Sequence, residues 1–354
     1  MSILKVHITN FRNFDEKLIE LSQKITVIVG PNASGKTNLL ESIYLLSTGK
    51  SFKANIEEEM INHNEELSRI KGKTDIENGG LEIVLTRGEV TVGDSKIEKV
   101  ARKRLFVNGV GKRLVDFAGK YQVVLFGPQD LDLVTESPSV RRNFLDDVLS
   151  QVDREYRRAS LSYEKGLRQR NKLLFRIREE GISRSQLLFW DKLLIKNGDY
   201  ISKRRGEFID FVNDTKPLDN QDFELVYDKS AISEARLEQY AREEVAAATT
   251  LVGPHRDDFC FRIKGKKTYR DLGKYGSRGE QRMSVLWLKL AELAFIQETT
   301  KEKPTLLLDD IFSELDHEHR KVVMDVVGNQ QTIITTADEH YIEGFKGEMI
   351  NIGI

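Results

Sequence analysis

The feature that most constrains this chain is the octapeptide at residues 30–37, GPNASGKT, which matches the pattern G-x-x-x-x-G-K-[ST] of a phosphate-binding loop. Residues 25–29 before it are apolar and mostly β-branched, which predicts a buried strand. After it, apolar residues recur at helical spacing, at Leu39, Leu40, Ile43 and Leu46. The full match in a strand–loop–helix context favours a nucleoside triphosphate site over a chance glycine-rich turn.

The residue types in this loop suit a triphosphate. Glycines let the backbone curl until its N–H groups point at phosphate oxygens, and the start of a helix adds a positive dipole end. The lysine is expected to reach the β- and γ-phosphates, and the threonine hydroxyl to ligate Mg²⁺. We therefore predict a nucleoside triphosphate and Mg²⁺ as ligands, contacted by Gly30, Pro31, Asn32, Ala33, Ser34, Gly35, Lys36 and Thr37.

Length, charge and cysteine content limit the other possibilities. A chain of 354 residues is long enough for two lobes, and a net charge of −1 means that any nucleic-acid surface must be local. The single cysteine, Cys260, excludes an internal disulfide and a cysteine-based zinc cluster. No apolar run approaches about 20 residues, so we expect no membrane span and a cytoplasmic protein.

A second group of candidate residues lies towards the C-terminus. Residues 275–282, YGSRGEQR, place small residues at the start of a long apolar-periodic helix, which predicts a second anion site. Residues 305–310, TLLLDD, read as a buried strand that ends in two carboxylates. Asp309 is suited to hold Mg²⁺ and Asp310 to polarise an attacking water, although paired acids at a strand end are often only a helix cap.

One more polar residue follows a predicted strand, and a sheet of different character lies beside it in the sequence. Gln129 comes just after the buried strand 123–126 and could orient a Mg²⁺-bound or attacking water, although a simple loop amide is the alternative. Between residues 67 and 108, short alternating strands are separated by glycine turns, including Asn108-Gly109. We predict an antiparallel sheet there.

The segment 154–205 is strongly basic. It carries fifteen Lys and Arg against six Asp and Glu, a net charge of about +9 in a chain of net charge −1. Apolar residues at seven-residue spacing predict an amphipathic helix that ends at Gly181, followed by a second helix. A DNA-contacting helical hairpin and a merely solvated helical lobe both remain open. The candidate DNA contacts are Arg168, Arg170, Lys172 and Arg176.

These motifs together resemble a known family. NFRNF at residues 10–14, the phosphate loop, GPHRDD at 253–258, SRGEQR and LLLDDIFSELD occur in that order. The set resembles the ABC-type ATPase heads of the SMC/Rad-fifty class, and closer still the RecF family of bacterial DNA repair proteins, over essentially the whole chain. The resemblance implies an α/β fold: an ABC-type P-loop ATPase head with a mixed central sheet and an antiparallel β subdomain, plus an inserted helical lobe. We expect the head at residues 1–134 and 245–354 and the lobe with the basic hairpin at 135–244.

The resemblance also implies roles for individual residues. In such heads ATP lies between two subunits, with the phosphate loop and Asp309 acting in cis. Ser277 and Gly279 would act in trans on the γ-phosphate, and Asp316 would lie in the D-loop of the dimer contact. Gln129 would occupy the Q-loop, Asp310 the position of the catalytic carboxylate, and Lys36 would assist the transfer. Arg12 would contact phosphate, and Thr336 would replace the switch histidine of many ABC ATPases.

The function implied is an ATP-dependent homodimer that grips DNA at gaps and single-strand/double-strand junctions. Such a protein would help RecO and RecR mediators load the recombinase during recombinational repair and replication-fork recovery. An aspartate in place of the usual glutamate, and no switch histidine, predict slow ATP hydrolysis that resets a switch. The alternatives are another SMC-like DNA-associated ATPase, a P-loop phosphotransferase, and a transporter-coupled ATPase.

Overall fold

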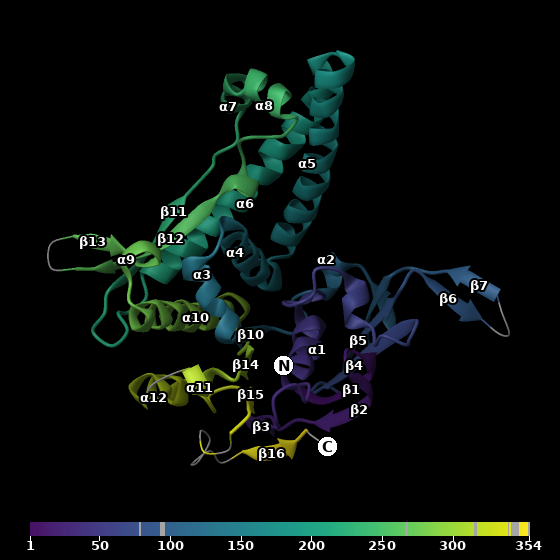
Figure 1. Ribbon diagram of the computed structural model, residues 1–354, viewed down its shortest axis with the longest axis vertical. Helices are drawn as coiled ribbons and strands as arrows, with labels where there is room; N and C mark the ends of the chain where they lie inside the picture. The colour runs from purple at the N-terminus through teal and green to yellow at the C-terminus, as the bar shows by residue number, and fades with distance from the viewer. Residues whose placement is uncertain are drawn as a thin grey trace. The chain divides into compact units, whose positions relative to one another are not determined.

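The computed structural model describes residues 1–77, 79–92, 96–265, 268–314, 317–338, 340 and 347–352 (Figure 1). The chain divides into two compact units. The first unit comprises Met1–Asp130 together with Ile296–Ile354, and the second unit comprises Leu131–Phe295.

The first unit contains a five-stranded sheet of order β10-β14-β15-β3-β16, and every pair of neighbours is parallel. Its strands are β3 (Ile25–Val29), β10 (Val123–Phe126), β14 (Thr305–Asp309), β15 (Thr332–Thr336) and β16 (Glu348–Asn351). Both faces of β10, β14 and β15 are buried, as their continuous apolar sequences require. The strands 25–29, 123–126 and 305–310 predicted from sequence are thus confirmed, and their carboxyl ends meet at one edge, where ligands bind in α/β sheets.

A six-stranded antiparallel sheet of order β2-β1-β4-β5-β8-β9 forms the rest of the first unit. Its strands are β1 (Ile3–Phe11), β2 (Phe14–Glu20), β4 (Leu67–Thr74), β5 (Gly80–Thr86), β8 (Lys103–Val107) and β9 (Val110–Lys112). Residues of β4 alternate strictly between exposed and buried, so one face of this sheet is solvated. The resemblance implied one central sheet of mixed strand direction. The first unit instead has its parallel pairs in one sheet and its antiparallel pairs in another.

Short elements complete the first unit. Helix α1 (Lys36–Thr48) contacts strands of both sheets and is almost entirely buried. The others are η1 (Glu57–Met60), the small sheet of β6 (Glu89–Val92) and β7 (Lys96–Lys99), α2 (Leu114–Phe117), η2 (Pro128–Leu131), α11 (Ile311–Glu314) and α12 (His317–Val326). Asn108 and Gly109 both have positive φ, 51° and 75°, and join β8 to β9 in the hairpin predicted for them.

The second unit is built on an antiparallel pair of long helices, α5 (Arg154–Glu180) and α6 (Leu188–Asn213) (Figure 1). Asp153 caps α5 by accepting hydrogen bonds from two backbone N–H groups, and Gly181 ends it with a φ of 68°, as predicted. Gly166 permits the close approach of α6, because a Cβ there would lie 2.6 Å from Leu193 Cδ2.

The remaining elements of the second unit follow along the chain. They are α3 (Asp132–Thr135), α4 (Pro138–Val152), η3 (Arg184–Leu187), β11 (Phe223–Asp228), α7 (Glu234–Gln239), α8 (Ala241–Ala247), η4 (Pro254–Arg256), β12 (Asp258–Lys264), β13 (Tyr269–Asp271) and α9 (Leu272–Tyr275). The last helix, α10 (Arg278–Thr300), lies in the second unit up to Phe295, and its final turn from Ile296 is counted with the first unit. We expected the chain to return to the ATPase head at residue 245, whereas the second unit continues to Phe295. Antiparallel pairing of β12 with both β11 and β13 joins residues 258–271 to the second unit.

Among the described residues, no helix combines the length and the apolar character that crossing a bilayer requires.

Candidate functional site

The phosphate loop lies between β3 and α1, as predicted. Gly35 adopts a φ of 103° at the N-cap of α1, a conformation that disfavours any residue with a Cβ. No side chain among the described residues caps this helix, so the first-turn N–H groups remain available to an anion. A Cβ on Gly30 would lie 2.1 Å from the carbonyl oxygen of Ile352, so the loop also needs glycine at its first position.

Lys36 lies inside the curve of this loop. Its side chain is buried, and its Nζ donates to the carbonyl oxygens of Gly30, at 2.6 Å, and Pro31, at 2.9 Å. Ser34 has a buried hydroxyl that finds no hydrogen-bond partner in the described part of the chain. A buried hydroxyl without a partner costs free energy, and a ligand that accepted from it would remove that cost. The loop therefore has both the charge and the vacant donor that a polyphosphate requires.

Thr37 and Asp309 are 272 residues apart in sequence, and the fold brings them together. Thr37 Oγ1 donates to Asp309 Oδ1 and Oδ2, at 3.1 and 2.9 Å. Thr335 Oγ1 on the neighbouring strand β15 donates to Asp309 Oδ1 at 2.7 Å, which fixes the carboxylate. A hydroxyl beside a carboxylate is the oxygen donor set that Mg²⁺ takes in nucleotide sites, so these two predicted ligands fit the ion. The described residues contain no cluster of three or more His, Cys, Asp or Glu that could hold a metal by itself, so phosphate oxygens would have to complete the shell.

Asp310 and Gln129 lie beyond the carboxyl ends of the adjacent strands β14 and β10. Asp310 has a φ of 49°, and its N–H donates to the Thr335 carbonyl and hydroxyl oxygens, both at 3.1 Å. Aspartate is one of the few non-glycine residue types that adopt this left-handed conformation readily, and here it turns the chain sharply at the end of β14. Gln129 is exposed. Both residues are at the predicted edge of the sheet, and their roles towards water stay predictions.

Arg12 makes a contact that sequence reasoning missed. Its Nε and Nη2 donate to the two oxygens of Glu41, at 2.8 and 2.7 Å, and its Nη1 donates to the Glu59 carbonyl oxygen at 2.8 Å. Glu41 lies on α1 one turn after Thr37 and is fully buried. These bonds use three of the five guanidinium N–H groups, and a phosphate contact by the other two stays a prediction.

Asn13, Asn38 and Lys53 form a second network that sequence reasoning missed. Asn13 Nδ2 donates to the Ser34 carbonyl oxygen at 3.3 Å, and Asn38 Nδ2 donates to Asn13 Oδ1 at 2.8 Å. Lys53 Nζ in turn donates to Asn38 Oδ1 at 3.1 Å. The β1–β2 turn thereby braces the phosphate loop. The only signal in the sequence is the position of Asn13 in the NFRNF motif, just before the loop strand.

The predicted signature lies in the second unit, at the start of α10. Ser277 caps this helix: its N–H and hydroxyl donate to Glu280 Oε2 at 2.8 and 3.0 Å, and the Glu280 N–H donates back to Ser277 Oγ at 3.3 Å. This is a capping box. Burial raises the pKa of Glu280, but the bonds from Ser277 and the neighbouring Arg270 outweigh it and lower the pKa overall. Gly279 is exposed, with open space at its Cβ position.

The predicted D-loop residue Asp316 lies outside the described residues. Thr336 ends β15, and its hydroxyl exchanges hydrogen bonds with the backbone of Asp338, at 3.0 Å to the carbonyl oxygen and 3.2 Å from the N–H. This polar turn is at the same edge of the sheet as Asp309.

The four candidate DNA contacts on α5 differ in exposure. Arg168 and Arg176 are exposed and pair with the acids four residues away on the same helix, and Lys172 is exposed. Arg170 is fully buried, with 1% of its side chain exposed, and its Nη2 lies 2.7 Å from Glu244 Oε2. The structure therefore corrects the expectation for Arg170, whose guanidinium is held by acids inside the second unit and is not available to DNA.

Part of the GPHRDD motif is buried within the second unit: Gly253, Pro254 and Asp257 are buried, whereas Arg256 is exposed. Asp257 accepts from Arg205 Nη1 at 3.1 Å, from the Ser230 N–H at 2.8 Å and from the hydroxyl of Tyr227 at 2.5 Å. His255 Nδ1 lies 2.8 Å from the Tyr163 hydroxyl, and burial lowers the pKa of His255 to about 4. These contacts give the motif a structural role in the second unit.

Comparison with known proteins agrees with this geometry. The family model described as "RecF/RecN/SMC N terminal domain" matches residues 2–352. The SMC head domain of Pyrococcus furiosus, solved with the C-terminal domain of ScpA, is 16% identical with a TM-score of 0.51 and covers 99% of this chain and 92% of its own; it shows a shared fold alone. The fold and the site thus define an ABC-type ATPase head of the SMC class.

Two further comparisons identify the family. The DNA replication and repair protein RecF of Lachnoclostridium phytofermentans is 35% identical over 347 residues, covering 95% of this chain and 92% of the relative. The solved structure of the recombination mediator protein RecF with ATP, from the RecFOR pathway, is 31% identical with a TM-score of 0.86 and covers 99% of this chain and 95% of its own. This chain belongs to the RecF family and functions in DNA replication and repair.

Proposed function

We propose that this protein is an ATP-dependent DNA-binding clamp of recombinational repair. In this proposal ATP and Mg²⁺ join two copies of the chain, the closed dimer grips DNA at gaps or junctions, and slow hydrolysis releases it. The observation that carries the proposal is the pairing of Thr37 with Asp309 at the carboxyl edge of the parallel sheet. It assembles a hydroxyl, a carboxylate and an uncapped helix start, which together suit a magnesium-bound triphosphate.

Different residues of the site would contact different parts of a bound triphosphate. Lys36 would exchange its two carbonyl partners for phosphate oxygens, and the backbone N–H groups and Ser34 hydroxyl would donate to the remaining oxygens. Thr37 and Asp309 would hold Mg²⁺, which when bound neutralises charge on the phosphates. Asp310 would accept a proton from the attacking water, with Gln129 orienting it. An aspartate reaches less far than a glutamate, so turnover should be slow.

The second copy would supply the signature. Ser277 and Gly279 are both exposed at the start of α10, where backbone N–H groups and a hydroxyl can meet an anion. The ATP-bound relative from the RecFOR pathway supports ATP as the ligand. It also supports RecO- and RecR-type mediators as further partners, with DNA as the substrate of the assembly.

The test is the nucleotide dependence of the oligomeric state. With a non-hydrolysable ATP analogue and Mg²⁺, light scattering after size-exclusion chromatography should show a dimer of the wild-type protein. Lys36→Ala should abolish both nucleotide binding and the dimer, whereas Ser277→Arg should bind nucleotide but remain monomeric. Asp310→Asn should bind ATP and accumulate as a dimer that does not turn over.

Two results would refute the proposal. A wild-type protein that is saturated with nucleotide yet stays monomeric and binds no DNA would exclude the clamp. A Ser277→Arg variant that dimerises normally would show that the second anion site is not at α10. A small-molecule phosphotransferase would show neither the dimer nor the effect of Ser277→Arg, so the same experiment separates these classes.

A further inference from the structure

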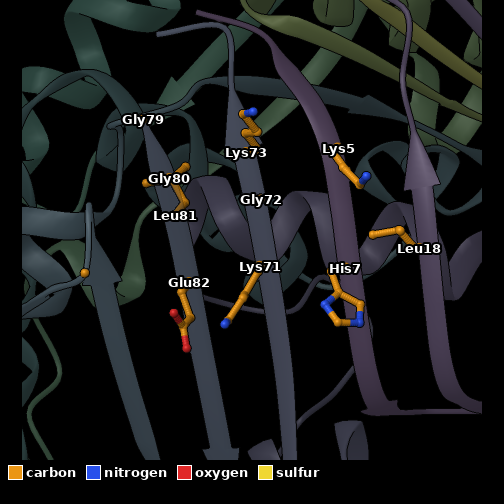
Figure 2. A pocket seen from close by; sticks show the side chains of 11 residues that line it. Lys5, His7, Leu18, Lys71, Gly72, Lys73, Gly79, Gly80, Leu81 and Glu82 are labelled. Carbon is orange, nitrogen blue, oxygen red and sulfur yellow. The ribbon is translucent and has the colours of Figure 1, made fainter. Parts of the chain in front are cut away.

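A hollow of about 420 Å³ opens on the solvent face of the antiparallel sheet, away from the nucleotide loop residues (Figure 2). Strands β1, β4 and β5 form its floor. Figure 2 shows Lys5 and His7 on β1 and Lys71 and Lys73 on β4 standing side by side over these strands. The hollow is therefore bordered by basic side chains from two neighbouring strands.

The register of the sheet brings two lysines directly opposite one another, Lys5 on β1 and Lys73 on β4. In the next outward-facing row, Lys71 lies between His7 on β1 and Glu82 on β5. Like charges directly across two strands destabilise a sheet, whereas most cross-strand neighbours stabilise it. An arrangement that costs stability in the free protein indicates a function at that place, and clustered cations indicate an anionic ligand.

The acidic residues of this face neutralise only part of the charge. Glu20 pairs with Lys5 at 3.0 Å, Glu16 with His7 at 2.9 Å, and Glu82 with Arg69 at 2.8 Å. Lys71 and Lys73 are exposed, and neither makes an ion pair with any described acid. Two lysines two residues apart on one strand, about 6.7 Å from each other along it, are thus available to a ligand.

Gly80 keeps the hollow open at its basic end. It lies opposite Lys73 on the other side, on β5, and contributes no side chain that could cover or neutralise the lysine. A Cβ at Gly80 would have only ordinary contacts, the nearest being the Gly72 carbonyl oxygen at 3.7 Å, so glycine is not required there by packing. The absence of a side chain at this position leaves Lys73 accessible from solvent.

We propose that this face of the antiparallel sheet is a nucleic-acid contact, in which Lys71 and Lys73 bind successive phosphates of a DNA backbone. The inference rests on the proposed function and adds to it a contact surface outside the basic hairpin. Exposed lysines in an open hollow suit a repeating polyanion, since a small phosphate ligand needs an enclosed site with buried donors. Backbone contacts of this kind position the protein without reading sequence.

The test compares DNA binding by matched variants in the presence of a non-hydrolysable ATP analogue. Fluorescence anisotropy would measure affinity for labelled duplex and single-stranded oligonucleotides over a range of salt concentrations. In Lys71→Ala/Lys73→Ala, the loss of two phosphate contacts should make the negative slope of log K against log salt shallower by about 1.8. It should weaken duplex binding at 0.1 M salt by up to about 60-fold. The control, Lys24→Ala/Lys120→Ala, removes two exposed lysines before strands β3 and β10 and should bind like wild type.

A second pair of variants leaves the lysines in place. Gly80→Glu puts a carboxylate opposite Lys73 and should weaken DNA binding about as much as the loss of one phosphate contact, roughly eightfold at 0.1 M salt. Gly80→Gln adds a side chain of nearly the same size without charge and should bind like wild type. Equal effects of the two Gly80 variants would mean that shape, not charge, is responsible, and would overturn the inference.

The outcomes separate this inference from the proposed function. If wild type binds DNA with ATP and the double-lysine variant binds it equally with an unchanged salt slope, the surface is not a DNA contact and the clamp still stands. That outcome would leave an acidic protein as the partner of the two lysines. If wild type shows no ATP-dependent DNA binding, the clamp and this surface fall together. Equal losses for duplex and single strands would assign the contact to the phosphate backbone alone.

Discussion

Replacing Arg170 by alanine should destabilise the second unit, because the Arg170 guanidinium compensates two acids inside it. Its Nε donates to Asp191 Oδ1 at 2.7 Å, its Nη2 lies 2.7 Å from Glu244 Oε2, and its Nη1 donates to Thr250 Oγ1 at 2.9 Å. These three partners lie on α6, on α8 and in the segment that follows α8. One side chain of α5 therefore holds three other segments together.

The magnitude follows from what the substitution leaves behind. Glu244 is 1% exposed and would keep only the Leu251 N–H, at 2.9 Å, among the donors that the structure describes. Breaking a buried ion pair by removing one partner costs about 3–5 kcal/mol, because the other charge stays buried and uncompensated. Asp191 is 22% exposed and can be rehydrated, so most of this cost comes from Glu244.

Urea unfolding followed by far-UV circular dichroism would measure the change. With a slope of about 2 kcal/mol per molar urea, a loss of 3–5 kcal/mol lowers the midpoint of the transition by about 1.5–2.5 M. Arg168→Ala is the matched control on the same helix. Its pair with Glu164 is exposed at both ends, so the loss should stay below about 0.5 kcal/mol.

A double variant tests the assigned cause. Arg170→Ala/Glu244→Gln removes the uncompensated charge and should regain part of the stability that Arg170→Ala loses. The reasoning would be refuted by an Arg170→Ala protein within about 1 kcal/mol of wild type that binds DNA more weakly than Arg168→Ala does. Arg170 would then have to be accessible to DNA in solution.

Three other outcomes can be measured directly. Gly35→Ala would force a Cβ to 2.8 Å from Asn13 Nδ2 at a φ of 103°, so titration calorimetry should find nucleotide binding lost while the circular dichroism spectrum is kept. Burial lowers the pKa of His255 from 6.5 to about 4, so acid protonates this side chain in the unfolded protein first. The free energy of unfolding should therefore fall by about 2–3 kcal/mol between neutral pH and pH 4.5 on account of His255. Urea unfolding of wild type and His255→Asn at pH 7 and at pH 4.5 would measure this difference. Thr335→Val removes the hydroxyl that fixes Asp309 and should raise the Mg²⁺ concentration required for nucleotide binding about 10–100-fold. Nucleotide affinity measured without Mg²⁺ should change little.

Local patterns were enough to predict the elements around the phosphate loop. A β-branched apolar run, a glycine-rich loop and helical periodicity specify β3 and α1 without any distant partner, and Asn108-Gly109 likewise specifies its hairpin through φ alone. The pairing of Thr37 with Asp309 could also be anticipated, since both residues belong to motifs with known roles. Each segment on its own predicted a Mg²⁺ ligand, and the shared ion, not any local pattern, links the two residues.

Arg170 shows where reading by composition misleads. The seven-residue series that predicts α5 as amphipathic runs through Tyr156, Tyr163 and Ile177, and Arg170 occupies its missing member. The periodicity therefore predicts that Arg170 lies on the buried side of α5. The charge count of the segment does not distinguish Arg170 from its exposed neighbours, so it wrongly suggested a DNA contact. Its acidic partners lie 21 and 74 residues further along the chain, so only the fold could identify them.

The basic hollow could not have been found from sequence for a related reason. Lys71 and Lys73 read as the polar half of an ordinary alternating strand, which is the default for a sheet with one solvated face. Their opposition to His7 and Lys5 depends on the register between β1 and β4, and a shift of one residue would abolish it. Register across a separation of this length is set by tertiary packing and not by local sequence.

The two helix starts that could meet a triphosphate differ in how they are capped, and this sets an order of events. The start of α1 has no side-chain cap in the part of the chain that the structure describes, so an anion there displaces none of those acceptors. The start of α10 is occupied by the carboxylate of Glu280, which accepts from the Ser277 N–H and hydroxyl. Under the proposed function, nucleotide should bind first at the phosphate loop, and the signature of the partner copy should bind it only when Glu280 releases the Ser277 N–H and hydroxyl.

Glu280→Gln removes the competing charge, so the dimer formed with an ATP analogue should tighten while the affinity of the monomer for nucleotide stays unchanged. Analytical ultracentrifugation would measure both, and a dimer constant equal to or weaker than wild type would mean that the capping carboxylate does not oppose closure.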